Sequence, residues 1–225
     1  MPMKPQIFSF LYRPLVWLLF YFSLFLGLCT MTQADTLGDE TLAAIEKLYT
    51  HNGFSADFSQ SSTLSALEIT ETASGKAWFS HPGKMRWLYL SPQRHEITTN
   101  GRALWIYRPD QNQVMRGNAK KFFKAGAGAA FLSDIRKMRQ EFNIEVKETT
   151  DTHISFLLTA KQKNPELVIL LIQVSRKTHK ITQVTTQNTY GDTTTFQFTN
   201  IQFKPMDASI FEFKIPEGSS IIEMD

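Results

Sequence analysis

Cysteine is almost absent from the sequence, which contains a single one, Cys29, among 225 residues. Cys29 follows an apolar run near the N-terminus, and Leu28 stands where a bacterial lipidation motif needs a small residue. If the chain is cleaved after Ala34, the mature protein contains no cysteine, which excludes disulfides and thiol chemistry. We therefore expect its stability to come from core burial, and a lipid anchor on Cys29 is the alternative.

The sequence also lacks the residue constellations that common enzymes need. Its five histidines are scattered, and none stands at metal-ligand spacing from another histidine or a carboxylate. A G-x-S-x-G elbow and a phosphate-binding glycine loop are both missing. We therefore expect no catalytic residue, no metal, no cofactor and no enzymatic activity. An enzyme that uses an unrecognised carboxylate or histidine site is the alternative.

An excess of charge of either sign is missing as well. The formal net charge is +3, and it falls to about +1 if Lys4 and Arg13 leave with the first 34 residues. Binding of nucleic acid requires a basic face. The sequence therefore predicts no nucleic acid partner.

Residues 1–34 have the features of a secretory signal peptide. Lys4 and Arg13 supply a positive region, Leu15–Leu28 is an apolar run without charge, and Thr32-Gln33-Ala34 offers small residues for cleavage. The apolar run is too short for a stable membrane span. We expect residues 35–225 to form one mature domain outside the cytoplasm.

The segment Gly75–Pro109 predicts an antiparallel meander. Apolar and polar residues alternate in it between turn signals at His81-Pro82-Gly83, Ser91-Pro92 and Asn100-Gly101. Asn-Gly favours a tight two-residue hairpin. Along Met85–Leu90, the alternation places Met85, Trp87 and Tyr89 on one inward face, opposite Arg86.

Most of the remaining mature chain also has strand patterns. A helix is expected first, over Asp39–Asn52, with Asp39 as its cap and Gly53 as a left-handed residue at its end. Ten or eleven strands without a βαβ rhythm predict a mainly β protein, either an antiparallel barrel or a strongly curved sheet. The other expected strands are Phe54–Gln60, Ile69–Ser80, Gln113–Arg116, Phe142–Glu148, His153–Lys161, Leu167–Val174, Lys180–Gln187, Thr193–Phe203 and Phe211–Ile215.

Residues 120–139 interrupt the strand pattern. They are rich in small residues and predict one or two short helices with glycine hinges at Gly126 and Gly128. Such a segment is either a fixed cover for an open sheet or a movable lid. The aromatic residues of the meander leave a related choice open, between a thick core and an apolar cavity that binds an apolar ligand.

Several motifs together resemble the LolA family of periplasmic outer-membrane lipoprotein carriers. The central one is Gly75-Lys-Ala-Trp-Phe-Ser-His-Pro-Gly-Lys-Met-Arg-Trp, followed by Pro92 and by Asn100-Gly-Arg-Ala-Leu-Trp-Ile-Tyr. Phe54-x-x-x-Phe-x-Gln precedes it, and Asp207-Ala-Ser-x-Phe-x-Phe-x-x-Pro-x-Gly ends the chain. The resemblance spans nearly the whole mature chain and implies a half-open antiparallel barrel with a helical lid.

The resemblance also implies a function. A protein of this family takes lipoproteins from an inner-membrane ABC transporter, holds their acyl chains in an apolar cavity and passes them to a LolB-like receptor lipoprotein of the outer membrane. We expect such a carrier to be a periplasmic monomer; a carrier or anchored receptor for another lipid is the alternative. Carried onto this chain, the cavity wall is Phe79, Met85, Trp87, Leu170, Ile172, Phe196 and Phe198, and the lid is Phe131, Leu132 and Ile135.

One position departs from the family pattern. Family members place an arginine before the proline of the second strand, where it holds the lid shut, and this chain has His81 before Pro82. A neutral imidazole has one donor where a guanidinium has five. We expect His81 to contact the lid and to hold it less firmly or in a pH-sensitive way; a lock elsewhere, at Lys84 or Arg86, is the alternative.

Overall fold

The computed structural model of the protein describes residues 36–124, 128–162 and 165–224. The expected signal peptide, Cys29 and the hinge glycine Gly126 lie outside the described residues. The chain divides into two compact units, Met1–Glu40 and Thr41–Asp225. In the first unit, the described residues 36–40 are helical. The second unit contains the whole β-sheet.

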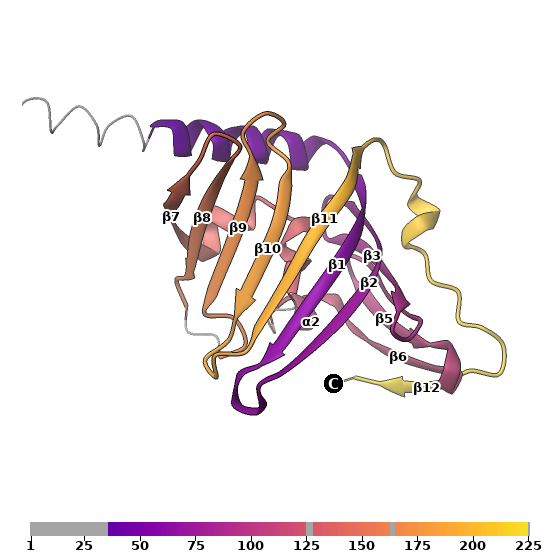
Figure 1. Cartoon of the computed structure of the whole chain (residues 1–225). Coiled ribbons are helices and arrows are strands. Elements are labelled where there is room, and N and C mark those ends of the chain that lie inside the picture. The colour runs from indigo at the N-terminus through magenta and orange to yellow at the C-terminus, as the bar shows by residue number, and fades with distance from the viewer. Residues whose placement is uncertain (1–35, 125–127, 163–164, 225) are drawn as a thin grey trace, which may run out of the picture. The chain divides into compact units, whose positions relative to one another are not determined.

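This sheet has twelve strands in the order β12-β6-β5-β4-β3-β2-β1-β11-β10-β9-β8-β7. Neighbours are antiparallel, except that β12 is parallel to β6. Within the described chain, β12 and β7 are the two edges, so the sheet does not close. Figure 1 shows that the sheet is curved. The prediction of a half-open antiparallel barrel is confirmed, with twelve strands in place of ten or eleven. The strands are β1 (Phe54–Leu64), β2 (Ile69–Ser80), β3 (Lys84–Ser91), β4 (His95–Asn100), β5 (Ala103–Arg108), β6 (Gln113–Asn118), β7 (Phe142–Thr149), β8 (His153–Ala160), β9 (Ile169–Ser175), β10 (Ile181–Gln187), β11 (Thr193–Phe203) and β12 (Ser220–Glu223).

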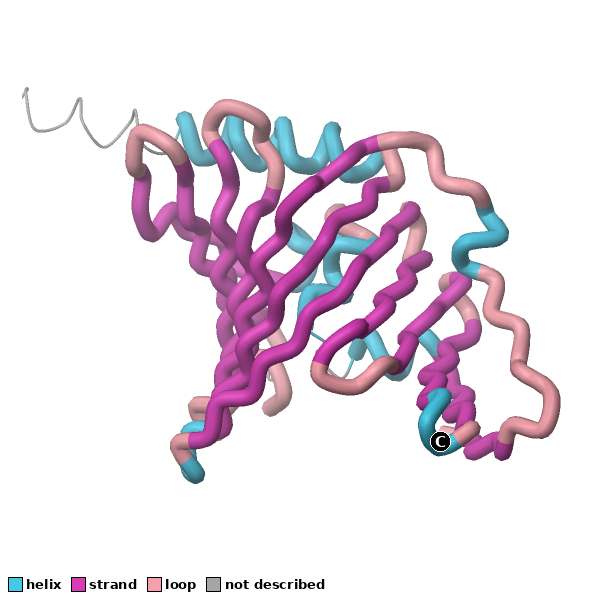
Figure 2. Tube along the Cα trace, turned by 45° about the vertical axis from the view of Figure 1, so that its right-hand side comes forward, coloured by secondary structure: helices cyan, strands magenta, loops and turns pink. Residues whose placement is uncertain are grey.

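Short helices occupy the segment whose composition predicts them. They are α2 (Ala119–Lys124), the 3-10 helix η3 (Gly128–Ser133) and α3 (Lys137–Glu141). Because η3 contacts β2, β3 and β10, it lies on one face of the sheet, which we call the inner face. Figure 2 shows helices within the curve of the strands. None of the helices in the described part of the chain is long and apolar enough to cross a membrane.

The N-terminal helix comprises residues 36–51, so two details of its prediction are wrong. Asp39 lies inside the helix and does not cap it. Gly53 does not have a positive φ angle. A side chain there would instead overlap the carbonyl oxygen of Phe79 and the side chain of Met206, so glycine is required by close packing.

The part of this helix that belongs to the larger unit packs through its apolar side. Leu42, Ile45 and Tyr49 are buried. The backbone N–H of Ile181 in β10 donates to the hydroxyl of Tyr49 at 2.8 Å. The helix is thereby fixed to the sheet at the start of β10.

The C-terminal segment differs from its prediction. The expected strand over Phe211–Ile215 is not formed; the chain has a 3-10 helix, η4 (Ala208–Phe211), and then an irregular run. The alternating aromatic residues serve packing on the outer face, where Phe213 lies 6.1 Å from Trp105 and 5.8 Å from Tyr107 between ring centres. The unpredicted strand β12 follows and extends the sheet beyond β6.

Candidate functional site

The side chains predicted to form the cavity wall lie together on the inner face of the sheet. The register carries this face from strand to strand, because directly paired residues point to the same side. Ile172 pairs with Val184, and Val184 pairs with Phe196. All seven predicted side chains are at most 6% exposed: Phe79, Met85, Trp87, Leu170, Ile172, Phe196 and Phe198.

Trp87 is the centre of the aromatic part of this wall. Its ring centre lies 4.8 Å from that of Phe58, 5.1 Å from that of Phe196 and 5.4 Å from that of Phe79. Edge-on and tilted aromatic contacts at these distances are favourable beyond the apolar area that they bury. The wall therefore combines two halves of the sheet, β1 to β3 and β9 to β11, that are far apart in the sequence.

The prediction omitted several inner-face residues. Phe58 belongs to the aromatic cluster, and Ile154, Phe156 and Leu158 of β8 are each at most 1% exposed. Phe156 pairs with Ile172 and so shares its face. The alternation of Ile154, Phe156 and Leu158 at every second residue was a usable signal for this part of the wall.

The predicted lid residues lie in the cover formed by η3 and the turn after it. Leu132 is 3% exposed and Ile135 is 1% exposed, whereas Phe131 is half-buried. The backbone N–H of Gly83, in the turn between β2 and β3, donates to the carbonyl oxygen of Ser133 at 2.9 Å. This bond attaches the cover to the sheet at one defined point.

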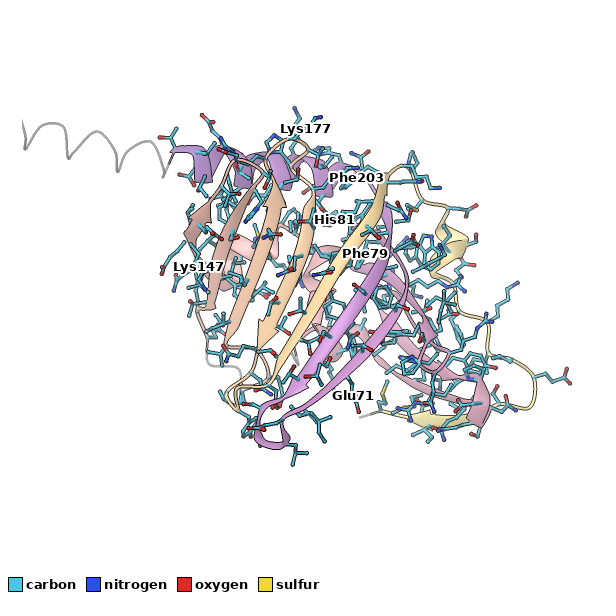
Figure 3. All side chains as sticks on the ribbon, viewed as in Figure 1. Glu71, Phe79, His81, Lys147, Lys177 and Phe203 are labelled. Carbon is cyan, nitrogen blue, oxygen red and sulfur yellow. The ribbon has the colours of Figure 1, made fainter. Side chains whose placement is uncertain are left out.

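A second contact joins the same two places. The Nδ1 atom of His81 lies 3.4 Å from Oδ1 of Asp134, and their side chains are 15% and 16% exposed. Nδ1 is buried without a hydrogen bond in the described structure, while the same Asp134 oxygen accepts from Nε of Arg136 at 3.2 Å. Figure 3 shows His81 near Phe79 and far from Glu71, which marks the other end of β2. The arrangement becomes an ion pair when the imidazole is protonated.

The described residues offer no metal site on the inner face. No group of three His, Cys, Asp or Glu side chains that could hold a metal occurs in residues 36–124, 128–162 and 165–224. Tyr89 is the inner-face residue with a clearly shifted titration, because burial raises its pKa to about 12. Its hydroxyl donates to Oε1 of Gln60 at 2.8 Å.

A groove of about 380 Å³ is separate from this wall. Most of its lining side chains alternate with the inner-face residues of β1, β2 and β11, so the groove opens on the outer face. None of the predicted wall residues contributes to it. Its lining is Ser59, Gln60, Ser61, Thr72, Ala73, Ser74, Ser91, Thr195 and Gln197.

These features define a class of protein: a half-open antiparallel β-barrel with an apolar inner face and a helical cover. The model of one family, described as outer membrane lipoprotein carrier protein LolA, matches residues 49–214 of this chain. That range is more than half of the sequence. The chain belongs to the LolA family.

Individual relatives agree with this assignment. An outer-membrane lipoprotein carrier protein of Chromohalobacter salexigens is 27% identical over 198 residues, covering 88% of this chain and 92% of its own. One of Coxiella burnetii is 24% identical over 186 residues, with 82% and 87% covered. Among solved structures, an uncharacterized conserved protein of Thermus thermophilus has a TM-score of 0.53 at 10% identity, covering 83% of this chain and 99% of its own. This last similarity concerns the fold alone.

Proposed function

We propose that the protein is a periplasmic carrier that binds the acyl chains of lipoproteins on its apolar inner face and moves lipoproteins from the inner to the outer membrane. The observation that carries the proposal is the continuous buried wall around Trp87, which crosses the sheet from β3 to β9 and lies beneath a separate helical cover. In this proposal, the protein acts without enzymatic chemistry, metal or cofactor.

The energetics of such a wall suit an acyl chain. Removal of a methylene from water is worth about 0.8 kcal/mol, so a chain of about 15 carbons gains roughly 12 kcal/mol when fully buried. In the structure, Leu132 and Ile135 of the cover occupy buried positions. An entering chain displaces apolar cover side chains and takes over their contacts, so the wall stays dry in both states. Binding and release then need movement of the cover and no covalent step.

The contact between His81 and Asp134 acts, in this proposal, as the closure of the cover. It joins the turn after β2 to the residue that follows η3. A single imidazole contact holds less firmly than a two-pronged guanidinium contact. The carrier therefore opens readily. As a monomer, it receives cargo from an inner-membrane ABC transporter and passes it to a LolB-like receptor lipoprotein in the outer membrane.

Native mass spectrometry of the protein purified gently from its own periplasm tests this proposal. A bound mass that matches an acylated lipoprotein, together with release of lipoproteins from spheroplasts when the purified protein is added, is the expected result. A bound phospholipid with no lipoprotein release would move the function to another lipid. An empty protein that also fails to bind an acylated peptide would refute the carrier proposal.

A further inference from the structure

The inner face changes character along its strands. On β1, buried Phe58 is followed on the same face by half-buried Gln60 and Ser62. On β11, buried Phe196 is adjacent on this face to half-buried Thr194. The apolar wall therefore ends in a strip of neutral hydroxyl and amide groups. We call this strip the polar belt: Gln60, Ser62, Thr186, Thr194 and the hydroxyl of Tyr89.

Hydrogen bonds connect the polar belt across the sheet. The Tyr89 hydroxyl donates to Oε1 of Gln60 at 2.8 Å, and Nε2 of Gln60 donates to Oγ of Ser62 at 2.9 Å. Oγ of Ser62 in turn lies 3.2 Å from Oγ1 of Thr194. This chain of bonds links β3, β1 and β11 and holds the belt side chains in fixed positions.

Small residues on β2 make this connection possible. Strand β2 lies between β1 and β3 and presents Ala73 and Gly75 to the inner face, so Tyr89 reaches Gln60 above them. A Cβ atom at Gly75 would overlap the carbonyl oxygen of Leu88 and lie 3.0 Å from the ring of Phe58. No side chain of β2 therefore stands between Tyr89 and Gln60 at Gly75, a position where close packing requires glycine.

The groups of the polar belt are neutral donors and acceptors. The Gln60 amide has a second N–H beyond the one given to Ser62, and hydroxyl hydrogens rotate to suit a partner. The Tyr89 ring is held from its other side by His95, at 4.1 Å between ring centres and nearly parallel. The charged inner-face neighbour, Glu71, is exposed and lies beside Ser62. Neutral donors beside a carboxylate suit carbonyl oxygens and disfavour anions such as phosphate.

We propose that the polar belt binds the ester and amide carbonyl groups that join the acyl chains of the cargo to its head. This inference rests on the proposed function, because it takes the apolar wall to hold the chains. Successive inner-face positions on a strand are about 7 Å apart, so a chain that contacts Phe58 has its carbonyl end one step further along β1, at the level of Gln60 and its partner Phe196. The belt thereby selects acylated amphiphiles over plain alkyl chains and fixes how deeply they enter.

Two probes separate the belt from the wall. One is a tripalmitoylated cysteinyl peptide, which carries ester and amide carbonyl groups, and the other is a fluorescent hexadecyl compound without any carbonyl group. Their affinities are measured for the whole mature protein and for the variants Gln60→Leu and Tyr89→Phe. We expect each variant to bind the lipopeptide about 3- to 10-fold more weakly, as for the loss of one hydrogen bond, with hexadecyl binding unchanged. Gln197→Leu, an exposed outer-face change on β11, is the matched control and leaves both affinities unchanged.

The outcomes distinguish the two proposals. Wild-type protein that binds neither probe would refute the carrier proposal. Wild-type protein that binds both, with variants that bind both equally well, would refute the polar belt alone. An equal loss for both probes would also overturn the belt, since it would show a change in the wall. Tyr89→Phe removes one oxygen atom and keeps the ring, so it guards against failure of the Gln60 variant to fold.

Discussion

The cover and an acyl chain compete for the same wall if the carrier proposal is correct, and Leu132→Ala tests this competition. Leu132 is 3% exposed in η3, which packs on β2, β3 and β10. Truncation of a buried leucine costs about 2 to 5 kcal/mol, and a short cover places Leu132 at the low end, about 2 kcal/mol. This loss applies to the closed state and shifts the population toward the open one.

The expected result is tighter binding of an apolar ligand after removal of an apolar side chain. If the closed state excludes the chain, the apparent Kd falls in proportion to the gain in open protein, at most about 30-fold for 2 kcal/mol. Titration of a fluorescent palmitoyl probe measures the affinity. Hydrogen exchange of residues 128–135 measures opening and should accelerate by a similar factor.

A matched control is Leu42→Ala, in the N-terminal helix. Leu42 is 4% exposed, so its truncation lowers the free energy of unfolding by a comparable amount. It lies outside the cover and leaves probe affinity unchanged. Weaker probe binding by Leu132→Ala would refute the competition, because Leu132 would then be part of the surface that holds the chain.

Three further predictions concern closure, acid stability and packing. His81→Ala should accelerate hydrogen exchange of the cover about twofold to fivefold, and His81→Arg should slow it, because a guanidinium can bind Asp134 through two N–H groups; unchanged exchange in both would contradict the contact. A hydrogen bond from Asn200, and next the contact with Lys76, lower the pKa of Asp57 below its usual range. The Asp57 carboxylate therefore stabilises the fold above the usual carboxyl pKa, and this contribution is lost on acidification. The urea midpoint of Asp57→Asn should depend less on pH below about 4 than that of the wild type. Gly75→Ala should lower the free energy of unfolding by about 3 kcal/mol, since its methyl group meets a β3 carbonyl oxygen, and an unchanged denaturation midpoint would show that β2 and β3 can separate there.

The sequence predicts most of the sheet because alternation and turn chemistry are local signals. Along Met85–Leu90, every second residue is buried, as expected from the polar Arg86 between Met85 and Trp87. Asn100 and Gly101 also mark a hairpin, in which the Asn100 side chain accepts from two backbone N–H groups of the turn. These features depend on neighbours in the chain and need no knowledge of the rest.

The wrong predictions concern residues whose structure depends on contacts between distant parts of the chain. Phe211 and Phe213 alternate as a strand would, yet they pack on the outer face of β3 to β5 instead of pairing with a neighbour. Gly53 follows the N-terminal helix as a helix-ending glycine would, but glycine is required there by the close approach of Phe79 in β2 and of Met206. In Leu104–Arg108, both sets of alternate residues are apolar, so the sequence does not indicate which set faces inward. The contacts of Phe213 with Trp105 and Tyr107 show that the C-terminal segment covers their face.

Separation along the sequence also decides which contacts between site residues could be predicted. Phe79 and Trp87 belong to one meander, and their proximity follows from a local hairpin. Their closeness to Phe196 follows from the pairing of β1 with β11, which no local pattern specifies. The composition of residues 128–133 indicates a helix, but it does not indicate that this helix packs on β2, β3 and β10.

The pairing of β1 with β11 also orders the events of folding. Phe54 pairs with Phe203, near opposite ends of the described chain, so the centre of the sheet forms only after almost all of the polypeptide is available. Until then, β1 and β2 present an apolar face and an unpaired strand edge, which are the features that favour aggregation. A chain that stops before β11 keeps that edge permanently, so residues 193–225 control whether the first strands stay soluble.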